Sequence, residues 1–270
     1  MNYTLNIHGR LLSLDKPCVM GILNATPDSF YAESRAQTEE QIALRAQQIV
    51  DEGGAIIDVG ACSTRPGSTP VDEQEEMERL RLALTTVRRL QPQAVVSVDT
   101  FRPHVARMAV EELGADIIND VGSPDGTQRE AMFRMVARLG VPYVLMTAEP
   151  TLRQTLLTLA DEVQQLRNMG HKDIIIDPGF GFGKTVEQNY ELMAQLEKLQ
   201  VLELPLLVGV SRKSMIWRRL DITPEQALNG TTALHAVALM KGASILRVHD
   251  VKEAVECVRI MAALSPNSKL

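Results

Sequence analysis

The feature of this sequence that most constrains its fold is a pattern that occurs eight times: a short apolar segment, a polar loop and an amphipathic helical stretch. The apolar segments are residues 18–23, 55–59, 94–98, 116–118, 142–146, 172–176, 206–210 and 244–248. Near-continuous apolar character is typical of parallel strands that are covered on both faces. Eight such units in about 250 residues predict an α/β fold, the (β/α)8 TIM barrel. A doubly wound open sheet is the alternative.

The chain begins with a different pattern, in which residues 3–7 and 10–14 alternate around His8-Gly9-Arg10. This alternation predicts an N-terminal β-hairpin, which we expect to plug the bottom of the barrel. Helices are expected at about 38–52, 72–90, 103–113, 127–139, 155–169, 187–199 and 224–240, with a last helix that ends near residue 263. No linker or low-complexity segment interrupts the units, so residues 1–270 are predicted to form a single domain.

Composition excludes several classes of protein. The net charge is −6 and no run of Lys or Arg occurs, so nothing favours nucleic-acid binding. No apolar stretch approaches the roughly 20 residues of a membrane span, and the polar first 14 residues do not resemble a signal peptide. Three cysteines, far apart and odd in number, predict reduced thiols and a cytoplasmic protein.

A glycine-rich loop follows the sixth apolar segment, with the sequence Asp177-Pro178-Gly179-Phe180-Gly181-Phe182-Gly183-Lys184. Three glycines at alternate positions allow the backbone to approach a ligand closely. The loop is not a nucleotide P-loop, because the first glycine that this motif requires would fall on Pro178. We therefore expect a ligand-binding loop of another kind, which carries one acid, two aromatic rings and one lysine.

Polar side chains stand at or just after the C-terminal end of nearly every predicted strand: Asn24, Asp58, Asp99, Asn119, Asp177, Lys213, Arg247 and His249. In a TIM barrel these positions share the rim that carries the active site. Capping of the following helices is the alternative for each Asp or Asn. It does not explain Lys213, Arg247 and His249, which are not N-cap residues.

The rim residues suggest two kinds of ligand. Asp99, Asn119, Asp177 and Lys213 offer the acceptors and donors that suit a flat heterocycle. Asn24, Arg247 and His249, with the last helix N-terminus, suit an anion such as phosphate, and Arg65 could serve either group. No Cys/His cluster has the spacing of a zinc site.

Eight sequence blocks, each at a predicted strand end, carry a resemblance to a known family. They are residues 20–30, 56–60, 63–67, 97–100, 118–121, 177–184, 211–214 and 247–251. Among them are Ser63-Thr64-Arg65-Pro66-Gly67, the glycine-rich loop and Ser211-Arg212-Lys213-Ser214. In these blocks, over nearly its whole length, the chain resembles the bacterial dihydropteroate synthases.

The resemblance implies the condensation of 6-hydroxymethyl-7,8-dihydropterin diphosphate with 4-aminobenzoate, which gives 7,8-dihydropteroate and diphosphate with the participation of Mg²⁺. It implies that the catalytic residues are Asp99, Lys213, Arg65 and Asp58, and that Asn24 lies at the metal. It implies substrate contacts from Thr64, Pro66, Asn119, Met146, Asp177, Phe182, Ser214, Arg247 and His249. Residues 26–31 would close over the aminobenzoate, and a homodimer would form through the late helices.

The proposed chemistry agrees with the residues on the rim. Diphosphate leaves readily once its charge is neutralised, and Asp99 can stabilise the cationic dihydropterin methylene that remains. The weakly basic arylamine then needs no strong base, and no nucleophile–base pair is evident in the sequence.

The chain departs from the family pattern at three places: residues 31–35, Ala61-Cys62 and Met146-Thr147-Ala148. These departures keep open a non-catalytic pterin-binding homologue. A methyltetrahydrofolate-dependent methyltransferase on the same barrel is the other alternative, but it needs neither the Ser-Thr-Arg-Pro loop nor a diphosphate site.

Overall fold

The structure is a computed structural model that describes residues 3–25, 32–62, 71–123 and 126–264, with the side chains of 32–37 excepted. The strands are β1 (Thr4–Ile7), β2 (Arg10–Ser13), β3 (Cys18–Asn24), β4 (Ile56–Gly60), β5 (Val95–Asp99), β6 (Ile117–Asp120), β7 (Tyr143–Met146), β8 (Ile174–Asp177), β9 (Leu207–Val208) and β10 (Ile245–Val248). The helices are α1 (Ala32–Asp51), α2 (Glu73–Leu90), α3 (Pro103–Glu111), α4 (Arg129–Leu139), α5 (Leu152–Asn168), α6 (Val186–Ala194), α7 (Ser214–Leu220), α8 (Leu228–Met240) and α9 (Val251–Ala263), with 3-10 turns η1 (Leu196–Leu202) and η2 (Pro224–Gln226).

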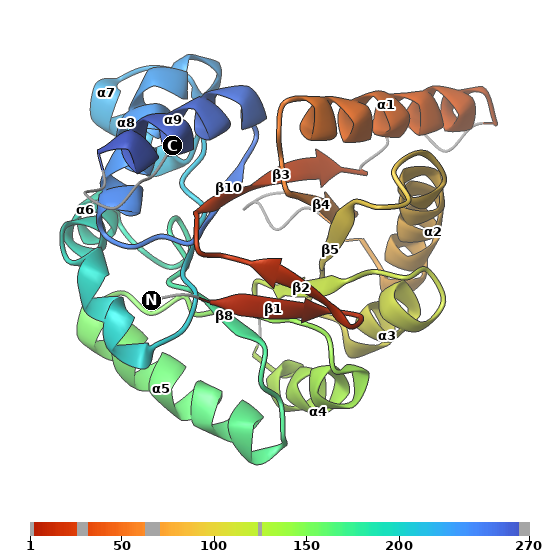
Figure 1. The fold of residues 1–270 in the computed structure, drawn as a ribbon, viewed down its shortest axis with the longest axis horizontal. Helices are drawn as coiled ribbons and strands as arrows, with labels where there is room; N and C mark the ends of the chain where they lie inside the picture. The colour runs from red at the N-terminus through yellow and green to blue at the C-terminus, as the bar shows by residue number, and fades with distance from the viewer. Residues whose placement is uncertain (1–2, 26–31, 63–70, 124–125, 265–270) are drawn as a thin grey trace.

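The main sheet is a nearly closed barrel of eight parallel strands. Its order is β8-β7-β6-β5-β4-β3-β10-β9, and a parallel bridge between Ile176 and Leu206 joins the two ends. The helices form a ring around the strands (Figure 1). The predicted (β/α)8 barrel is therefore confirmed, and the open sheet is excluded.

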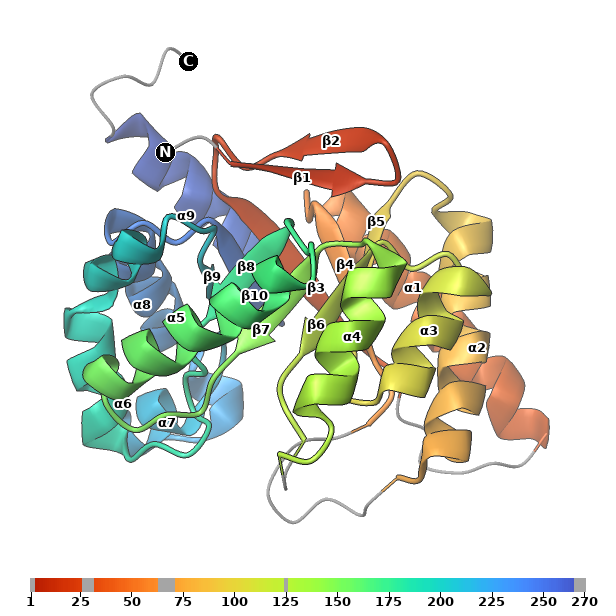
Figure 2. The same cartoon turned by 90° about the horizontal axis from the view of Figure 1, so that it is seen from below.

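The N-terminal hairpin of β1 and β2 lies across the end of the barrel at which the strands begin (Figure 2). Leu5, Ile7 and Leu14 pack against one inward-facing residue from each barrel strand. Those residues are Met20, Ile56, Val95, Ile117, Val144, Ile175, Leu207 and Ile245. The hairpin thus excludes water from the bottom layer of the barrel, as predicted, and leaves the opposite rim for a ligand.

A second and larger core lies between the strands and the helices. Alternate strand residues, such as Val19 and Leu23 of β3 or Ile57 and Val59 of β4, face outward into this layer. Both faces of each strand are therefore buried, which explains why the strand segments are largely apolar instead of alternating.

Several element boundaries differ from the predicted ones. The first helix begins at Ala32 rather than at residue 38. The helix expected at 224–240 is divided: Thr223 and Gln226 form a capping box around the short η2, and α8 begins at Leu228. The helix expected at 187–199 ends at Ala194 and continues as η1.

Two properties of the described residues bear on the environment of the protein. Cys18, Cys62 and Cys257 are free thiols, as predicted. In the part of the chain that the structure describes, no helix combines the length and apolar character needed to cross a bilayer.

Buried His235 of α8 should make the stability depend on pH. Its side chain is 1% exposed, and burial lowers its pKa from 6.5 to about 4, against a weak opposing effect of Asp250. The folded protein favours the neutral ring. The contribution of His235 to the free energy of unfolding is therefore complete above pH 6.5 and is lost as the pH falls from 6.5 through 4. We expect His235→Gln to remove a pH-dependent loss of about 3 kcal/mol.

Urea unfolding of the wild type and His235→Gln at pH 7, 5.5 and 4 measures this effect. His104→Gln, at an exposed position of α3, is the matched control for the replacement of a histidine by glutamine. Parallel pH profiles for the wild type and His235→Gln would contradict the prediction.

Candidate active site

The register of the parallel strands places the predicted rim residues side by side. Asn24 pairs with Gly60, Gly60 with Asp99, and Asp99 with Asn119, across four neighbouring strands. On the next pair of strands Met146 lies opposite Asp177. Polar residues that are far apart in the sequence therefore share one end of the barrel, opposite the hairpin.

At the centre of this rim, Arg247 of β10 joins two carboxylates. Its Nε donates to Asp58 Oδ2 over 2.7 Å, and its Nη2 donates to Asp99 Oδ2 over 2.6 Å. Asn119 Nδ2 also donates to Asp58 Oδ2, over 3.2 Å. The residues expected to hold a heterocycle and those expected to hold an anion are thus in contact with each other through Arg247.

Asp58 and Asp99 have different environments within this cluster. Asp58 is fully buried, and its Oδ1 has no hydrogen-bond partner among the described residues. Burial raises the pKa of Asp99 to about 7; Arg247 opposes this shift, and the charge of Asp58 adds to it. A carboxylate in this position is poorly solvated and interacts strongly with any cation that forms above it.

The glycine-rich loop forms the neighbouring part of the rim. Gly179 has a φ of +68°, and a Cβ at this position would lie 2.1 Å from the carbonyl oxygen of Thr147. Only glycine fits there, and its N–H donates to Asp177 Oδ1 over 2.8 Å. Lys184 Nζ donates to the carbonyls of Gly179 and Phe182, at 3.0 and 3.3 Å. The loop is thereby fixed around Asp177.

Lys213 extends over this loop from the start of α7. Its ammonium donates to the Phe180 carbonyl and lies 4.6 Å from the centre of the Phe182 ring. The Phe180 carbonyl and the face of the Phe182 ring together hold the ammonium group in place.

Burial lowers the pKa of Lys213 to about 8. The charges of Asp177 and Asp99 oppose this shift, and those of Arg247 and Lys184 add to it. Burial also raises the pKa of Asp177, although Lys213 opposes it. The side chains of Asp177 and Lys213 can thus present a matched acceptor and donor to a planar ring.

Asn24 and His249, which the sequence analysis assigns to an anion, also lie on this rim. Asn24 is exposed, and His249 Nδ1 lies 3.1 Å from Ser211 Oγ, which also accepts the His249 N–H over 3.2 Å. Arg45 Nη2 donates to the carbonyl oxygen of His249 over 2.5 Å. These contacts fix the backbone on which the imidazole is mounted.

Asn24 offers an exposed amide oxygen of the kind that magnesium accepts as a ligand. A Cβ placed on Gly60 would lie 3.9 Å from Asn24 Oδ1 and 3.9 Å from Asp99 Oδ2, and Asp99 Oδ2 accepts from Arg247 Nη2 over 2.6 Å. Among the described residues, no three His, Cys, Asp or Glu side chains gather into a metal cluster. An all-protein cage is thus not formed there, but Mg²⁺ commonly binds through one or two side chains, water and substrate phosphates.

Other predicted residues are placed less directly. Ser214 begins α7 and is half-buried, and Met146 is buried on β7. Thr64, Arg65 and Pro66 lie outside the described residues, as do residues 26–31. The predicted roles of these residues stay predictions.

Three residues that the sequence analysis did not single out support the rim: Arg45, Ser211 and Asn189. Asn189 is buried and accepts the N–H of Gly181 over 2.7 Å. Ser211 could have been found, because it follows a predicted strand within the Ser-Arg-Lys-Ser block. Arg45 and Asn189 lie within helical patterns and carry no signal of their own.

Comparison with known proteins agrees with this geometry. A family model described as pterin binding enzyme matches residues 20–249. The dihydropteroate synthase of Escherichia coli K12 is 37% identical over 94% of both chains, and that of Bacillus subtilis is 38% identical over 93% of this chain and 89% of its own. The structure of Xanthomonas albilineans dihydropteroate synthase with 4-aminobenzoic acid superposes with a TM-score of 0.90, at 36% identity over 99% of this chain and 100% of that chain.

The matched barrel and its rim define an enzyme of the pterin-binding class. The chain belongs to the dihydropteroate synthase family within that class.

Proposed function

We propose that this protein is a dihydropteroate synthase, a transferase that joins 6-hydroxymethyl-7,8-dihydropterin diphosphate to 4-aminobenzoate. The observation that carries this proposal is the Asp58–Arg247–Asp99 cluster beside Asp177 and Lys213. These residues together offer a polar site for a flat ring and, beside it, buried negative charge that can stabilise the cation formed at the pterin methylene. Full-length similarity to curated dihydropteroate synthases supports the same substrates.

In the proposed reaction the C–O bond between the pterin methylene and the diphosphate breaks, and its electron pair leaves with the diphosphate. The nitrogen of 4-aminobenzoate forms the new bond to the methylene, and the ammonium proton is lost to water. Asn119, Asp177 and Lys213 bind and orient the pterin ring. Asp99 stabilises the developing positive charge, and His249 with Asn24 binds the diphosphate.

Magnesium is proposed as the metal cofactor, with Asn24 as a ligand and Asp58 close by. When bound, it would neutralise part of the charge on the diphosphate. Calorimetric titration with Mg²⁺, with and without the pterin diphosphate, tests this: the ion should bind much more tightly with the substrate present. Undiminished product formation in excess EDTA would reject the metal.

The assay that tests the function measures dihydropteroate and diphosphate together. The purified protein is supplied with the pterin diphosphate, 4-aminobenzoate and Mg²⁺. Equal amounts of both products establish the synthase. Diphosphate release without dihydropteroate would show a failing aminobenzoate site, and substrate binding without either product would indicate the non-catalytic homologue.

The alkaline limb of the pH profile should report Lys213. Its ammonium is the form that donates to the pterin ring, so kcat/KM for the pterin diphosphate should fall as the pH rises through about 8. Arginine keeps its charge throughout this range, so Lys213→Arg should lose the alkaline limb even where its maximal rate is lower. An unchanged limb in Lys213→Arg would show that another group is responsible.

A homodimer through the late helices is proposed from the surface of α8. Ala233 and Met240 share one face of this helix and are both exposed, Met240 by 76%, while Val237 between them is half-buried against the core. An apolar helix face that is open to water is a common place for a subunit contact. Sedimentation should give a dimer of the 29.8 kDa chain, and Met240→Glu should dissociate it. A monomeric wild type at micromolar concentration would reject the interface.

We propose that the enzyme acts in the cytoplasm. Its three free thiols support a reducing compartment. Fractionation of cells that express the chain tests the location, and recovery in another compartment would contradict it.

A further inference from the structure

Arg212 lies between two residues of the proposed site loop and has an unusual backbone. It follows Ser211, precedes Lys213 and has a φ of +54°. This left-handed conformation is unfavourable for a residue with a Cβ and persists only where surrounding contacts enforce it. The N–H of Arg212 donates to Thr231 Oγ1 over 3.0 Å, which ties the turn to α8.

The Arg212 side chain is held even more extensively. Nε donates to Asp250 Oδ2 over 2.9 Å and Nη2 to Asp250 Oδ1 over 2.8 Å, a bidentate pair. Nη1 donates to the carbonyls of Pro224 and Glu225, at 3.0 and 2.6 Å. All three guanidinium nitrogens are therefore engaged, and the planar arginine fork determines where the turn lies.

Asp250 occupies the N-cap position of α9 but does not cap the helix. An aspartate at this position ordinarily accepts an N–H from the first turn. Here its side chain makes no capping hydrogen bond, and both of its oxygens accept from Arg212. The residue therefore links two loops instead of stabilising its own helix.

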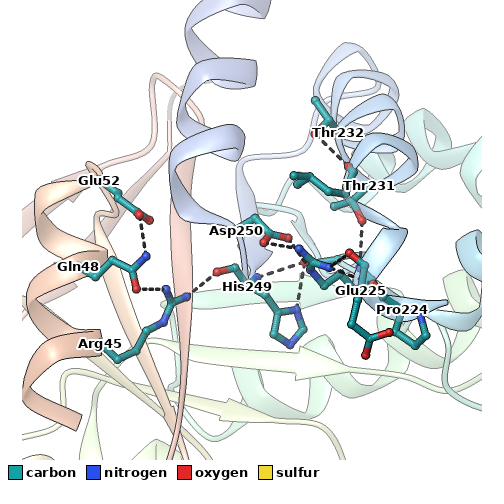
Figure 3. A network of polar contacts seen from close by, with 12 residues as sticks. Arg45, Gln48, Glu52, Pro224, Glu225, Thr231, Thr232, His249 and Asp250 are labelled. Atoms are coloured by element: carbon teal, nitrogen blue, oxygen red, sulfur yellow. Dashed lines mark hydrogen bonds and ion pairs between the residues drawn. The ribbon is translucent and has the colours of Figure 1, made fainter. Parts of the chain in front are cut away.

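The linked loops carry opposite ends of the proposed site. One loop carries Lys213, which is proposed to bind the pterin ring, and the other carries His249, which is proposed to bind the diphosphate. A second link, between Ser211 and His249, lies directly beside the Arg212–Asp250 pair. Figure 3 shows His249 and Asp250 between Arg45 of α1 and Thr231 of α8. The contacts thus fix the spacing between the two parts of the rim.

We propose that Arg212 and Asp250 are positioning residues that hold Lys213 and His249 at the separation required by a substrate with a pterin ring at one end and a diphosphate at the other. This inference rests on the proposed function and goes further, because neither residue is among the substrate contacts proposed for this site. A rigid spacing lets the two ends bind together without a further loss of conformational freedom. A pterin alcohol that lacks the diphosphate uses one end only and gains little from this spacing.

The test compares the wild type with Arg212→Lys, Asp250→Asn and the double variant. Calorimetry gives the Kd for the pterin diphosphate and for 6-hydroxymethylpterin, and steady-state kinetics gives KM for both substrates. Each single variant should weaken binding of the pterin diphosphate by about tenfold or more, and that of the pterin alcohol by less than about threefold. KM for 4-aminobenzoate should be unchanged, and the double variant should be no worse than the more impaired single variant.

A purely structural role gives a different result. It would lower the urea midpoint and weaken both ligands by the same factor, which would overturn the proposal, as would unchanged binding of the pterin diphosphate. Arg212→Lys keeps the charge and tests the bidentate contact even where Asp250→Asn folds poorly. Arg138→Lys is the matched control, because Arg138 pairs with Glu111 over 2.7 Å between α4 and α3, away from these loops.

The behaviour of the wild-type protein distinguishes a failure of this proposal from a failure of the proposed function. A wild type that binds the pterin diphosphate without forming product would reject the synthase, while the binding ratios would still judge the positioning pair. A wild type that binds neither pterin ligand would overturn both proposals.

Discussion

Replacement of Asp99 by asparagine is expected to lower kcat by about 10²- to 10³-fold, the size of effect that loss of one preorganised electrostatic contact has in other enzymes. In the proposed reaction, departure of diphosphate leaves positive charge on the pterin methylene. Arg247 favours the charged form of Asp99 against the effect of burial, and in this poorly solvated position the negative charge of the carboxylate acts strongly on that cation. Asparagine has the same shape and lacks the charge, so stabilisation of the transition state is lost.

The fold should survive this substitution. Arg247 keeps Asp58 as its ionic partner, and the amide oxygen of asparagine can still accept from Nη2. We therefore expect KM for the pterin diphosphate to change much less than kcat, and the urea midpoint to stay close to that of the wild type. Asp161→Asn, on the exposed face of α5, is the control for removal of one negative charge. An unchanged kcat in Asp99→Asn would exclude the electrostatic role.

The barrel was predictable because its pattern is local and repeated. Each strand segment is largely apolar, and nearly every one has a polar residue at or just after the position where the strand ends. Asp99, Asn119 and Asp177 therefore appeared as rim residues before any contact was known. The hairpin was predictable for the same reason, since alternation and a turn of His8-Gly9-Arg10 lie within twelve residues.

The contacts among the rim residues were not predictable from local patterns. Arg247 and Asp58 are 189 positions apart, and their ion pair depends on how the barrel closes. Arg45 bonds His249 across 204 positions from the middle of a helix, where an arginine usually faces water. The division of the former 224–240 helix depends on side chains of Thr223 and Gln226 that compete with the helical backbone.

Replacement of Arg247 by methionine should have the largest combined effect. Methionine has a similar length and cannot neutralise Asp58 or Asp99, so the fully buried Asp58 and the 12% exposed Asp99 both lose their cation. Loss of one partner from a buried ion pair typically costs about 3–5 kcal/mol, because the other charge is left uncompensated. We expect a fall of this size in the free energy of unfolding, with loss of measurable product formation.

Second-site substitutions separate charge compensation from simple loss of packing. Asp58→Asn added to Arg247→Met removes one uncompensated charge, so it should recover part of the lost stability without restoring activity. Arg134→Met is the matched control: this arginine is 69% exposed, pairs with Glu130 on the same helix, and should change stability by less than about 0.5 kcal/mol. The contrary result is that Asp58→Asn destabilises the Arg247→Met protein further. The loss of stability in Arg247→Met would then arise from packing around the arginine stem, and Arg247 would not be the residue that keeps two acids charged at this rim.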